Sequence, residues 1–269
     1  MPGDAEGRRR LIVNADDFGF TRDVNAGIVE AHRHGILTAT TLMANGDAFE
    51  DAVALAAQTP SLDIGCHLVL VQGRSVLSPE HKLPETLKDL VHALVRRELP
   101  VYEEIAAQVR KILAAGIRPS HLDTHKHTHL LPPVLEAVAR AAHEFSIPWV
   151  RRPFDFGTDG GAPLVKRLVA VGMRVMQPGF AGLRSTDYFA GFQITGTLNE
   201  VSLARTLERL PNGLTEFMCH PGFLGPELRA AATRLKESRK IELAALLSPG
   251  IRRIIEQRGI ELVNFTGLA

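Results

Sequence analysis

The 269-residue sequence has little of what several classes of protein need. Its two cysteines are too few for a disulfide framework, and such a low count is typical of proteins in a reducing cytosol. Its 31 basic and 30 acidic residues nearly cancel, so we expect no nucleic acid partner and no general attraction to anionic lipid. Aromatic residues make up 6%, with one tryptophan, which argues against a long polysaccharide platform.

Long hydrophobic runs are also missing from the sequence. The first apolar run, Leu11 to Val13, stops at Asn14 and is too short for the core of a secretory signal. No uncharged stretch approaches the roughly 20 residues of a membrane-spanning helix. We therefore expect a cytoplasmic protein, located at the membrane surface if its substrate is a lipid. The polar residues 1–9 are expected to form a flexible tail.

Several catalytic signatures are absent as well. The sequence has no glycine-rich phosphate loop, no Gly-x-Ser-x-Gly elbow and no His-Glu-x-x-His helix. The sequence therefore argues against a nucleotide-dependent enzyme and against a serine hydrolase. Cys66 and Cys219 each precede a histidine, and we interpret both as buried small apolar residues, not as metal ligands.

The sequence does contain a regular alternation of short apolar runs and amphipathic segments. This alternation predicts a parallel sheet, most simply a (β/α) barrel in one domain over residues 1–269, with an open doubly wound sheet as the alternative. Residues 71–85 look like an irregular insertion. The expected strands are 11–15, 36–43, 62–70, 120–125, 148–152, 186–192, 214–220 and 262–265. The expected helices are 24–34, 49–58, 103–115, 133–145, 162–176, 200–210, 226–247 and 250–258.

Residues able to bind metal or transfer protons follow four of these strands. Asp16 and Asp17 follow the first, His67 lies on the third, a histidine cluster ends the fourth, and His220 ends the seventh. Because active sites of parallel α/β proteins lie at the carboxyl ends of strands, we expect these residues to converge. Two adjacent carboxylates repel each other unless a cation is near. A cation on one would leave the other free as a base, although the pair could also simply form a turn.

The histidine cluster contains four of the eleven histidines. His121, Asp123 and His125 alternate, so an extended chain would point all three to one face. A metal takes only two or three imidazoles beside a carboxylate, so not every histidine can be a ligand. The others, including His127 and His129, would orient ligands, contact substrate or face water. Chance clustering on a solvated loop is the alternative.

The remaining candidates are weaker when each is taken alone. His67 on its own resembles a hydrogen-bonded core histidine, while His220 stands before Pro-Gly at a corner where barrels place catalytic groups. Arg151 and Arg152 end the fifth strand, either as a solvated basic corner or with one arginine paired to Asp16. We include Arg152 among the predicted catalytic residues on that basis.

Together these residues resemble a known family. The segments are Leu-Ile-Val-Asn-Ala-Asp-Asp-Phe-Gly (11–19), Thr-Thr-Leu-Met-Ala-Asn-Gly (40–46), Ile-Gly-Cys-His-Leu (64–68), Pro-Ser-His-Leu-Asp-Thr-His-Lys-His-Thr-His (119–129) and Cys-His-Pro-Gly (219–222). They are similar to the YdjC-like carbohydrate deacetylases, the ChbG/HpnK group. The similarity runs in the same order over nearly the whole chain, and is less clear between residues 150 and 200.

The resemblance implies a distorted (β/α) barrel that removes an N-acetyl group from amino sugars with one divalent metal ion. It implies that Asp17, His67 and His125 bind the metal, that Asp16 is the general base and that His220 is the acid. One carboxylate with two imidazoles suits Zn²⁺, Mn²⁺ or Co²⁺, while Mg²⁺ is often assigned in the family.

Within the family the chain looks most like the hopanoid-associated HpnK branch, which implies an N-acetylglucosaminyl lipid as substrate. The partner would be a small N-acetylated sugar or a glycolipid head group, and a homo-oligomer stays open. Two other functions stay open: a metal-dependent hydrolase of a phosphoester or cyclic amide, and a non-catalytic metal- or carbohydrate-binding barrel. The single clear carboxylate pair argues against a two-metal phosphoester site.

Overall fold

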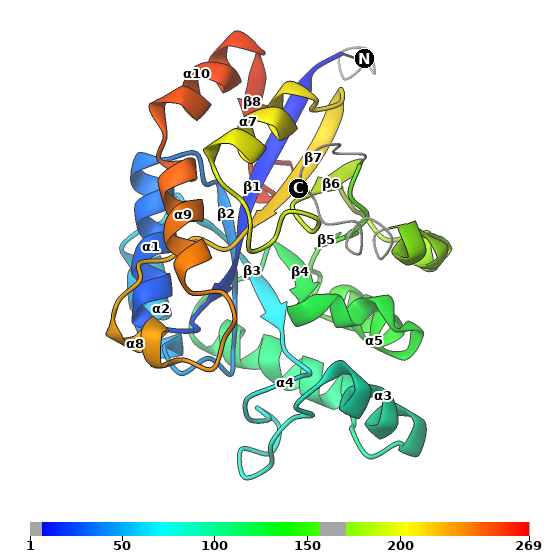
Figure 1. The fold of residues 1–269 in the computed structure, drawn as a ribbon. Helices are drawn as coiled ribbons and strands as arrows, with labels where there is room; N and C mark the ends of the chain where they lie inside the picture. Colours follow the sequence, from blue (N-terminus) through cyan, green and yellow to red (C-terminus); the bar gives the residue numbers. More distant parts are fainter. Residues whose placement is uncertain (1–6, 157–170, 269) are drawn as a thin grey trace.

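The computed structural model describes residues 7–156 and 171–268, and its centre is a sheet of parallel strands (Figure 1). The strands are β1 (Arg9–Phe18), β2 (Ala39–Leu42), β3 (Asp63–Leu68), β4 (His121–Thr124), β5 (Trp149–Val150), β6 (Tyr188–Ala190), β7 (Gly213–Cys219) and β8 (Ile260–Leu262). β1 begins at Arg9, within the segment expected to be a tail, and the tail residues 1–6 lie outside the described residues.

The strand order explains how the sheet curls into a barrel. The order is β5-β4-β3-β2-β1-β7-β6, with β8 paired to the start of β1. After β5 the chain runs to Asp155, which forms a parallel bridge with Phe189 of β6. The two edges of the sheet therefore meet through an irregular bridge. This confirms the prediction of a distorted (β/α) barrel over the open sheet.

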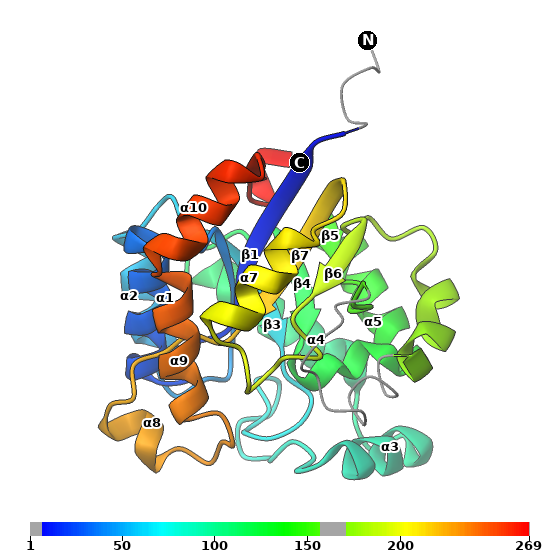
Figure 2. The ribbon, with the colours of Figure 1, turned by 45° about the horizontal axis from the view of Figure 1, so that its top comes forward.

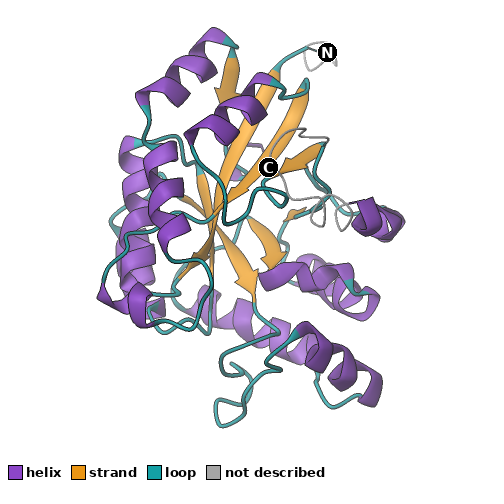
Figure 3. Cartoon of the chain, viewed as in Figure 1, coloured by secondary structure: helices purple, strands orange, loops and turns teal. Residues whose placement is uncertain are grey.

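Helices cover the outside of the curled sheet, as Figures 2 and 3 show. They are α1 (Arg22–His34), α2 (Phe49–Ala57), α3 (Leu87–Arg96), α4 (Val101–Ala114), α5 (Pro132–Glu144), α7 (Glu200–Glu208), α8 (Pro226–Ala230), α9 (Glu237–Leu246) and α10 (Pro249–Gln257). Three short 3₁₀ segments are η1 (His125–Leu130), η2 (Arg174–Phe180) and η3 (Thr266–Leu268). Among the described residues, no helix has the length and apolarity needed to cross a bilayer.

The structure departs from the expected elements in three places, and a further expected helix lies mostly outside the described residues. α3 was not predicted, although Thr86 and Asp89 form a reciprocal capping box at its start. The expected helix 226–247 is two helices, because the chain becomes extended at Ala231. The last strand ends at Leu262, and Phe265 beyond it packs inside the barrel. Of the expected helix 162–176, residues 162–170 lie outside the described residues.

The end of β1 is irregular, and this irregularity positions two carboxylates. The pairing of β1 with β2 shifts register between Ala15 and Phe18. Within this bulge Asp17 has φ 70°, in the left-handed region. Adjacent residues of a regular strand face opposite sides, but a bulge re-aims one side chain. Asp16 and Asp17 can therefore both reach the same end of the barrel.

The barrel interior is layered from apolar to polar along β1. Ile12 belongs to an apolar cluster near the start of the strand. Asn14 forms the next layer, with its Oδ1 3.1 Å from His121 Nε2. Asp16 forms the layer after that, where it is buried against the guanidinium of Arg151. The other members of the apolar cluster are Ala39, Trp149, Leu214 and Phe265. This cluster supports the polar layers above it, as side-chain layers do in barrel cores.

Candidate active site

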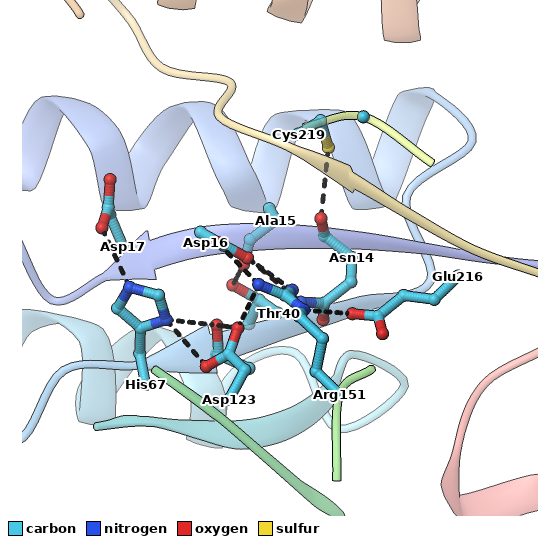
Figure 4. Close-up of polar contacts among 12 residues, drawn as sticks. Asn14, Ala15, Asp16, Asp17, Thr40, His67, Asp123, Arg151, Glu216 and Cys219 are labelled. Carbon is cyan, nitrogen blue, oxygen red and sulfur yellow. Dashed lines mark hydrogen bonds and ion pairs between the residues drawn. The ribbon is translucent and has the colours of Figure 1, made fainter. Parts of the chain in front are cut away.

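The three predicted metal ligands converge at the carboxyl ends of three strands. Asp17 comes from β1, His67 from β3, and His125 begins η1 directly after β4. Asp17 Oδ1 lies 3.4 Å from His67 Nε2 and 3.4 Å from His125 Nδ1, and the two nitrogens are 3.3 Å apart. Figure 4 shows the contact between Asp17 and His67. Residues 17, 67 and 125 thus form one compact group of ligand atoms.

The donor atoms fit a divalent cation. Asp17 Oδ1 is buried and has no hydrogen-bond partner among the described residues. The Nδ1 atom of His67 is held by Asp123 Oδ1 at 2.7 Å, so its Nε2 faces the other two donors. Zinc–nitrogen bonds of about 2.0–2.1 Å would separate tetrahedral ligands by about 3.3–3.4 Å, which matches the observed spacing. One carboxylate and two imidazoles are a usual set for such an ion.

A second cluster of possible ligands has a different role. Asp16, His67 and Asp123 also lie within reach of one another. Both oxygens of Asp16 accept hydrogen bonds from Arg151, and Asp123 Oδ2 lies 2.6 Å from the same guanidinium. The charge of Arg151 already satisfies these carboxylates, so this cluster has no need of a cation.

Arg239 of α9 supports the ligand Asp17 and was not predicted. Its Nη2 forms an ion pair with Asp17 Oδ2, and its side chain is 2% exposed. Burial raises the pKa of Asp17, but the charge of Arg239 and the nearby imidazoles of His125 and His67 outweigh burial and hold the pKa well below its ordinary value. Asp17 therefore stays ionised. One oxygen is held by Arg239 and the other is left for the ligand group.

Asp123 is the second support that the prediction left without a role. It is fully buried and accepts from His67 Nδ1, which orients the imidazole. Burial lowers the pKa of His67, but the charge and hydrogen bond of Asp123 outweigh burial and raise that pKa to about 10. The alternation of His121, Asp123 and His125 was the signal that could have identified it.

The arginine that pairs with Asp16 is Arg151, and Arg152, which the sequence predicts as catalytic, does not make this pairing. Arg151 Nη1 and Nη2 lie 2.8 Å and 2.7 Å from the two oxygens of Asp16, and its Nε lies 2.8 Å from Glu216 Oε1 (Figure 4). Arg152 instead donates to the backbone carbonyls of Thr186 and Asp187. The two arginines are neighbours on an extended segment, so only one can face the barrel interior.

Glu216 completes the charge cluster around Arg151. It is fully buried, and burial raises its pKa to about 7 even though Arg151 opposes the shift. The guanidinium of Arg151 thus contacts three buried carboxyl groups through ion pairs of 2.6–2.8 Å. This network fixes Asp16 in position next to the proposed ligands.

His220 directly follows β7 and lies on the other side of Asp16. Its Nε2 is 3.9 Å from Asp16 Oδ2. Burial lowers the pKa of His220 to about 4, although the charges of Asp16 and Asp17 raise it. His220 is therefore uncharged at neutral pH in the free protein. The predicted base and the predicted acid do face each other across a short gap.

The other three clustered histidines have structural contacts. His121 stacks on Phe265 at 3.9 Å between ring centres. His129 lies 3.1 Å from the carbonyl of Arg151 through Nε2, and its Nδ1 contacts the Thr124 hydroxyl. His127 is buried, and its ring packs edge-on against Phe189 and Phe192. β4 ends before His125, so the alternation predicted for residues 121, 123 and 125 does not continue through His125.

Both cysteines are free and buried, as predicted. Cys66 and Cys219 are 0% and 1% exposed, and neither belongs to a group of ligand atoms among the described residues. Burial raises the pKa of each thiol well above its ordinary value. They therefore remain protonated and pack as small apolar side chains.

Comparison with known proteins now identifies the family. The model of the YdjC-like protein family matches residues 10–257. The chain belongs to the YdjC-like family. Among the relatives of this YdjC-like chain, a carbohydrate deacetylase of Brevibacillus brevis is 33% identical over 267 residues, covering 96% of this chain and 99% of that protein. A chitooligosaccharide deacetylase of Yersinia enterocolitica is 34% identical, covering 95% and 98%.

A solved structure shares the fold of this YdjC-like protein. It comes from Enterococcus faecalis and carries the name of a cellobiose-phosphate cleavage protein. It superposes with a TM-score of 0.78 at 25% identity and covers 97% of this chain and 99% of that one. The distorted barrel is therefore shared along the whole length of both chains.

Proposed function

We propose that this protein is a metal-dependent hydrolase that removes the N-acetyl group of an amino sugar and releases acetate and a free amine. The observation that carries the proposal is the convergence of Asp17, His67 and His125, with Asp16 and His220 beside them. The names of the relatives, a carbohydrate deacetylase and a chitooligosaccharide deacetylase, support the same reaction.

The ligand group assigned here is Asp17, His67 and His125. A divalent cation bound there would supply a Lewis acid that polarises the amide carbonyl and makes water a stronger acid. The donor set suits Zn²⁺, Mn²⁺ or Co²⁺, and the family resemblance adds Mg²⁺. Arg239 and Asp123 would keep the carboxylate and one imidazole oriented toward the ion.

Asp16 is the general base in this proposal. Its two oxygens accept hydrogen bonds from Arg151, which orient the carboxylate next to the ligand group. As water attacks the acetyl carbonyl, Asp16 accepts the proton that the water loses. A positioned base of this kind contributes roughly 10²–10⁴-fold to the rate.

His220 is the acid that protonates the leaving sugar nitrogen. Because burial keeps it uncharged at neutral pH, it must first receive a proton. Asp16 lies 3.9 Å from its Nε2, so the proton taken from water can pass to His220 and then to the amine. The exchange balances: one proton leaves the water, one reaches the nitrogen, and the C–N bond breaks.

The substrate we propose is a small N-acetylated amino sugar or a glycolipid head group. The finer assignment, from the HpnK resemblance, is an N-acetylglucosaminyl hopanoid. The cytoplasmic location, the membrane-surface alternative and a homo-oligomer stay predictions of the sequence. Hydrolysis of a phosphoester is disfavoured, because a two-metal site needs a bridging carboxylate, while Asp16 and Asp123 are bonded to Arg151.

The test is release of acetate against release of phosphate. Zinc-loaded protein should release acetate from N-acetylglucosamine, diacetylchitobiose or an N-acetylglucosaminyl lipid, and no phosphate from a phosphoester panel. Asp16→Asn should keep the metal and lose roughly 10²–10⁴-fold in rate, the size of a general-base contribution. Phosphate without acetate would overturn the proposal, and an Asp16→Asn variant as fast as the parent would overturn the mechanism.

A further inference from the structure

Helix α9 lies on the outside of the barrel, yet two of its charged side chains are buried at the site. Arg239 and Glu242 stand three residues apart on the helix, and each is 1% exposed. Residues three apart share one face of a helix. Arg239 is bonded to Asp17, but Glu242 points to a different group. A fully buried carboxylate is costly unless it is paired, so the environment of Glu242 needs an explanation.

The contacts of Glu242 lead to His220. The backbone N–H of His220 donates to Glu242 Oε2 at 2.6 Å. The same oxygen lies 4.0 Å from His220 Nδ1. Among the described residues, His220 is the one ion-pair partner within 4.0 Å of Glu242. The carboxylate therefore faces both the backbone and the ring of one histidine.

Two buried polar atoms at this contact have no hydrogen-bond partner in the described part of the chain. They are His220 Nδ1 and Glu242 Oε1. A buried polar atom without a partner is costly, and the carboxylate oxygen that lies 4.0 Å from His220 Nδ1 is Oε2 of Glu242. A small rotation of the imidazole would bring Nδ1 into hydrogen-bond range of the carboxylate. The hydrogen bond from the backbone N–H of His220 already holds Glu242 next to the His220 ring.

The ring of His220 has a carboxylate on each side, and the two are not equivalent. Asp16, near Nε2, already accepts two bonds from Arg151. Glu242, near Nδ1, has no arginine ion pair among the described residues, and the groups that bond to it are the backbone N–H groups of His220 and Gly196. The Nδ1 atom should therefore carry the proton and donate to Glu242, which leaves Nε2 toward Asp16 and the reacting nitrogen. Asp17, His67 and Arg239 are the other charged or titratable groups that act on this ring.

We infer that Glu242 is a positioning residue: it holds Nδ1–H of His220 and so presents Nε2 to the reaction. The inference rests on the proposed role of His220 as acid and adds the residue that sets its orientation. Glu242 touches no reacting atom and acts only through His220. Partners that orient a metal-ligating histidine typically contribute 10–100-fold, and we expect an effect of that size for the orientation of His220.

The experiment uses full-length, zinc-loaded protein with ¹⁵N-labelled histidine. Long-range ¹H–¹⁵N spectra should show His220 as the Nδ1–H tautomer in the parent, with the signal assigned by its loss in His220→Gln. Glu242→Gln should change that tautomer and lower kcat for acetate release 10–100-fold, with KM within about twofold and zinc content unchanged. The matched control is Lys240→Gln, an exposed position of the same helix, which should match the parent.

The outcomes separate the inference from the proposed function. An Nε2–H tautomer in the parent would overturn the inference, and so would a Glu242→Gln variant with the parent's kcat and tautomer. If Glu242→Gln fails to fold, the spectrum of the parent still decides. If the parent releases no acetate from any substrate, the proposed function fails, while the spectrum continues to test whether Glu242 orients His220.

Discussion

At the scale of single residues, the site is held by buried charges that satisfy one another. Arg151 contacts Asp16, Asp123 and Glu216, and Arg239 contacts Asp17. Breaking one partner of a buried pair leaves an uncompensated charge, which is far more costly than losing a surface pair. These arginines therefore support the fold as well as the site.

Arg151 and its neighbour Arg152 form a matched pair for testing this. We predict that Arg151→Met lowers the free energy of unfolding by roughly 3–5 kcal/mol, because three carboxyl groups lose their cation. Arg152→Met should cost about 1 kcal/mol, the size of its bonds to two carbonyls. Urea denaturation measures both. Equal losses for the two variants would contradict the role given to Arg151.

The sequence identified residues at strand ends but not those on helices. Asp16, Asp17, His67, His125 and His220 were predictable because parallel strands bring their carboxyl ends together. The choice of Arg152 failed because β5 is two residues long, too short for its alternation to be read. Arg239 and Glu242 were missed, since a charged residue in an amphipathic helix looks exposed until the packing of that helix is known.

At the scale of elements, two connections shape the barrel around the site. The first is the irregular bridge between Asp155 and β6, which brings together the edges of the sheet. The side chain of Asp155 accepts from the backbone N–H groups of Phe192 and Gln193. Burial raises the pKa of Asp155 to about 7, although these bonds oppose the shift.

This pKa makes the bridge sensitive to pH. Since the folded pKa lies above the unfolded value of 3.8, Asp155 favours the folded state fully below pH 4, and this contribution is lost as pH rises through 7. Between pH 5.5 and 8 the free energy of unfolding should fall by about 2 kcal/mol more in the parent than in Asp155→Asn. Urea titrations at both pH values measure this difference, and parallel pH profiles would count against it.

The second connection is the loop of residues 71–85, which follows β3. It forms a short hairpin, with an antiparallel bridge between Arg74 and Lys82. The buried carboxylate of Glu104 in α4 accepts from the Ser75 hydroxyl at 2.5 Å and from the N–H groups of Val76 and Leu77. The insertion expected to be irregular is thus fastened to a helix.

Removing that attachment should free the hairpin selectively. We predict that Glu104→Ala speeds amide hydrogen exchange at Val76 and Leu77 and costs roughly 1–3 kcal/mol of stability, because the amides lose a buried acceptor. Amide exchange in β1 should speed up only as much as the lower free energy of global unfolding explains. Unchanged exchange at residues 76 and 77 would show that the carboxylate does not hold the loop.

The element boundaries show where sequence patterns were sufficient. The alternation of apolar runs located all eight strands to within a few residues, except the last, where Phe265 packs in the barrel interior instead of pairing. The start of α3 does have a sequence signal, the capping box formed by Thr86 and Asp89. The break between α8 and α9 has no signal in the periodicity, because helical spacing continues on both sides of it.

At the scale of the whole molecule, the parallel barrel brings together residues that are far apart in the sequence. Residues 17, 67, 125 and 220 belong to different β/α units, yet the carboxyl ends of their strands meet at one end of the barrel. The apolar cluster at the opposite end and the arginine network between them fix that meeting point. We propose that one divalent cation bound at this point is what makes the protein active as a deacetylase.

Metal reconstitution tests that claim most directly. Chelator-treated protein is titrated with Zn²⁺ while acetate release from diacetylchitobiose is followed. We expect negligible activity without metal, a linear rise that ends at one ion per chain, and neither binding nor activity in Asp17→Asn. Full acetate release by the chelated protein, or zinc binding in Asp17→Asn as tight as in the parent, would contradict it.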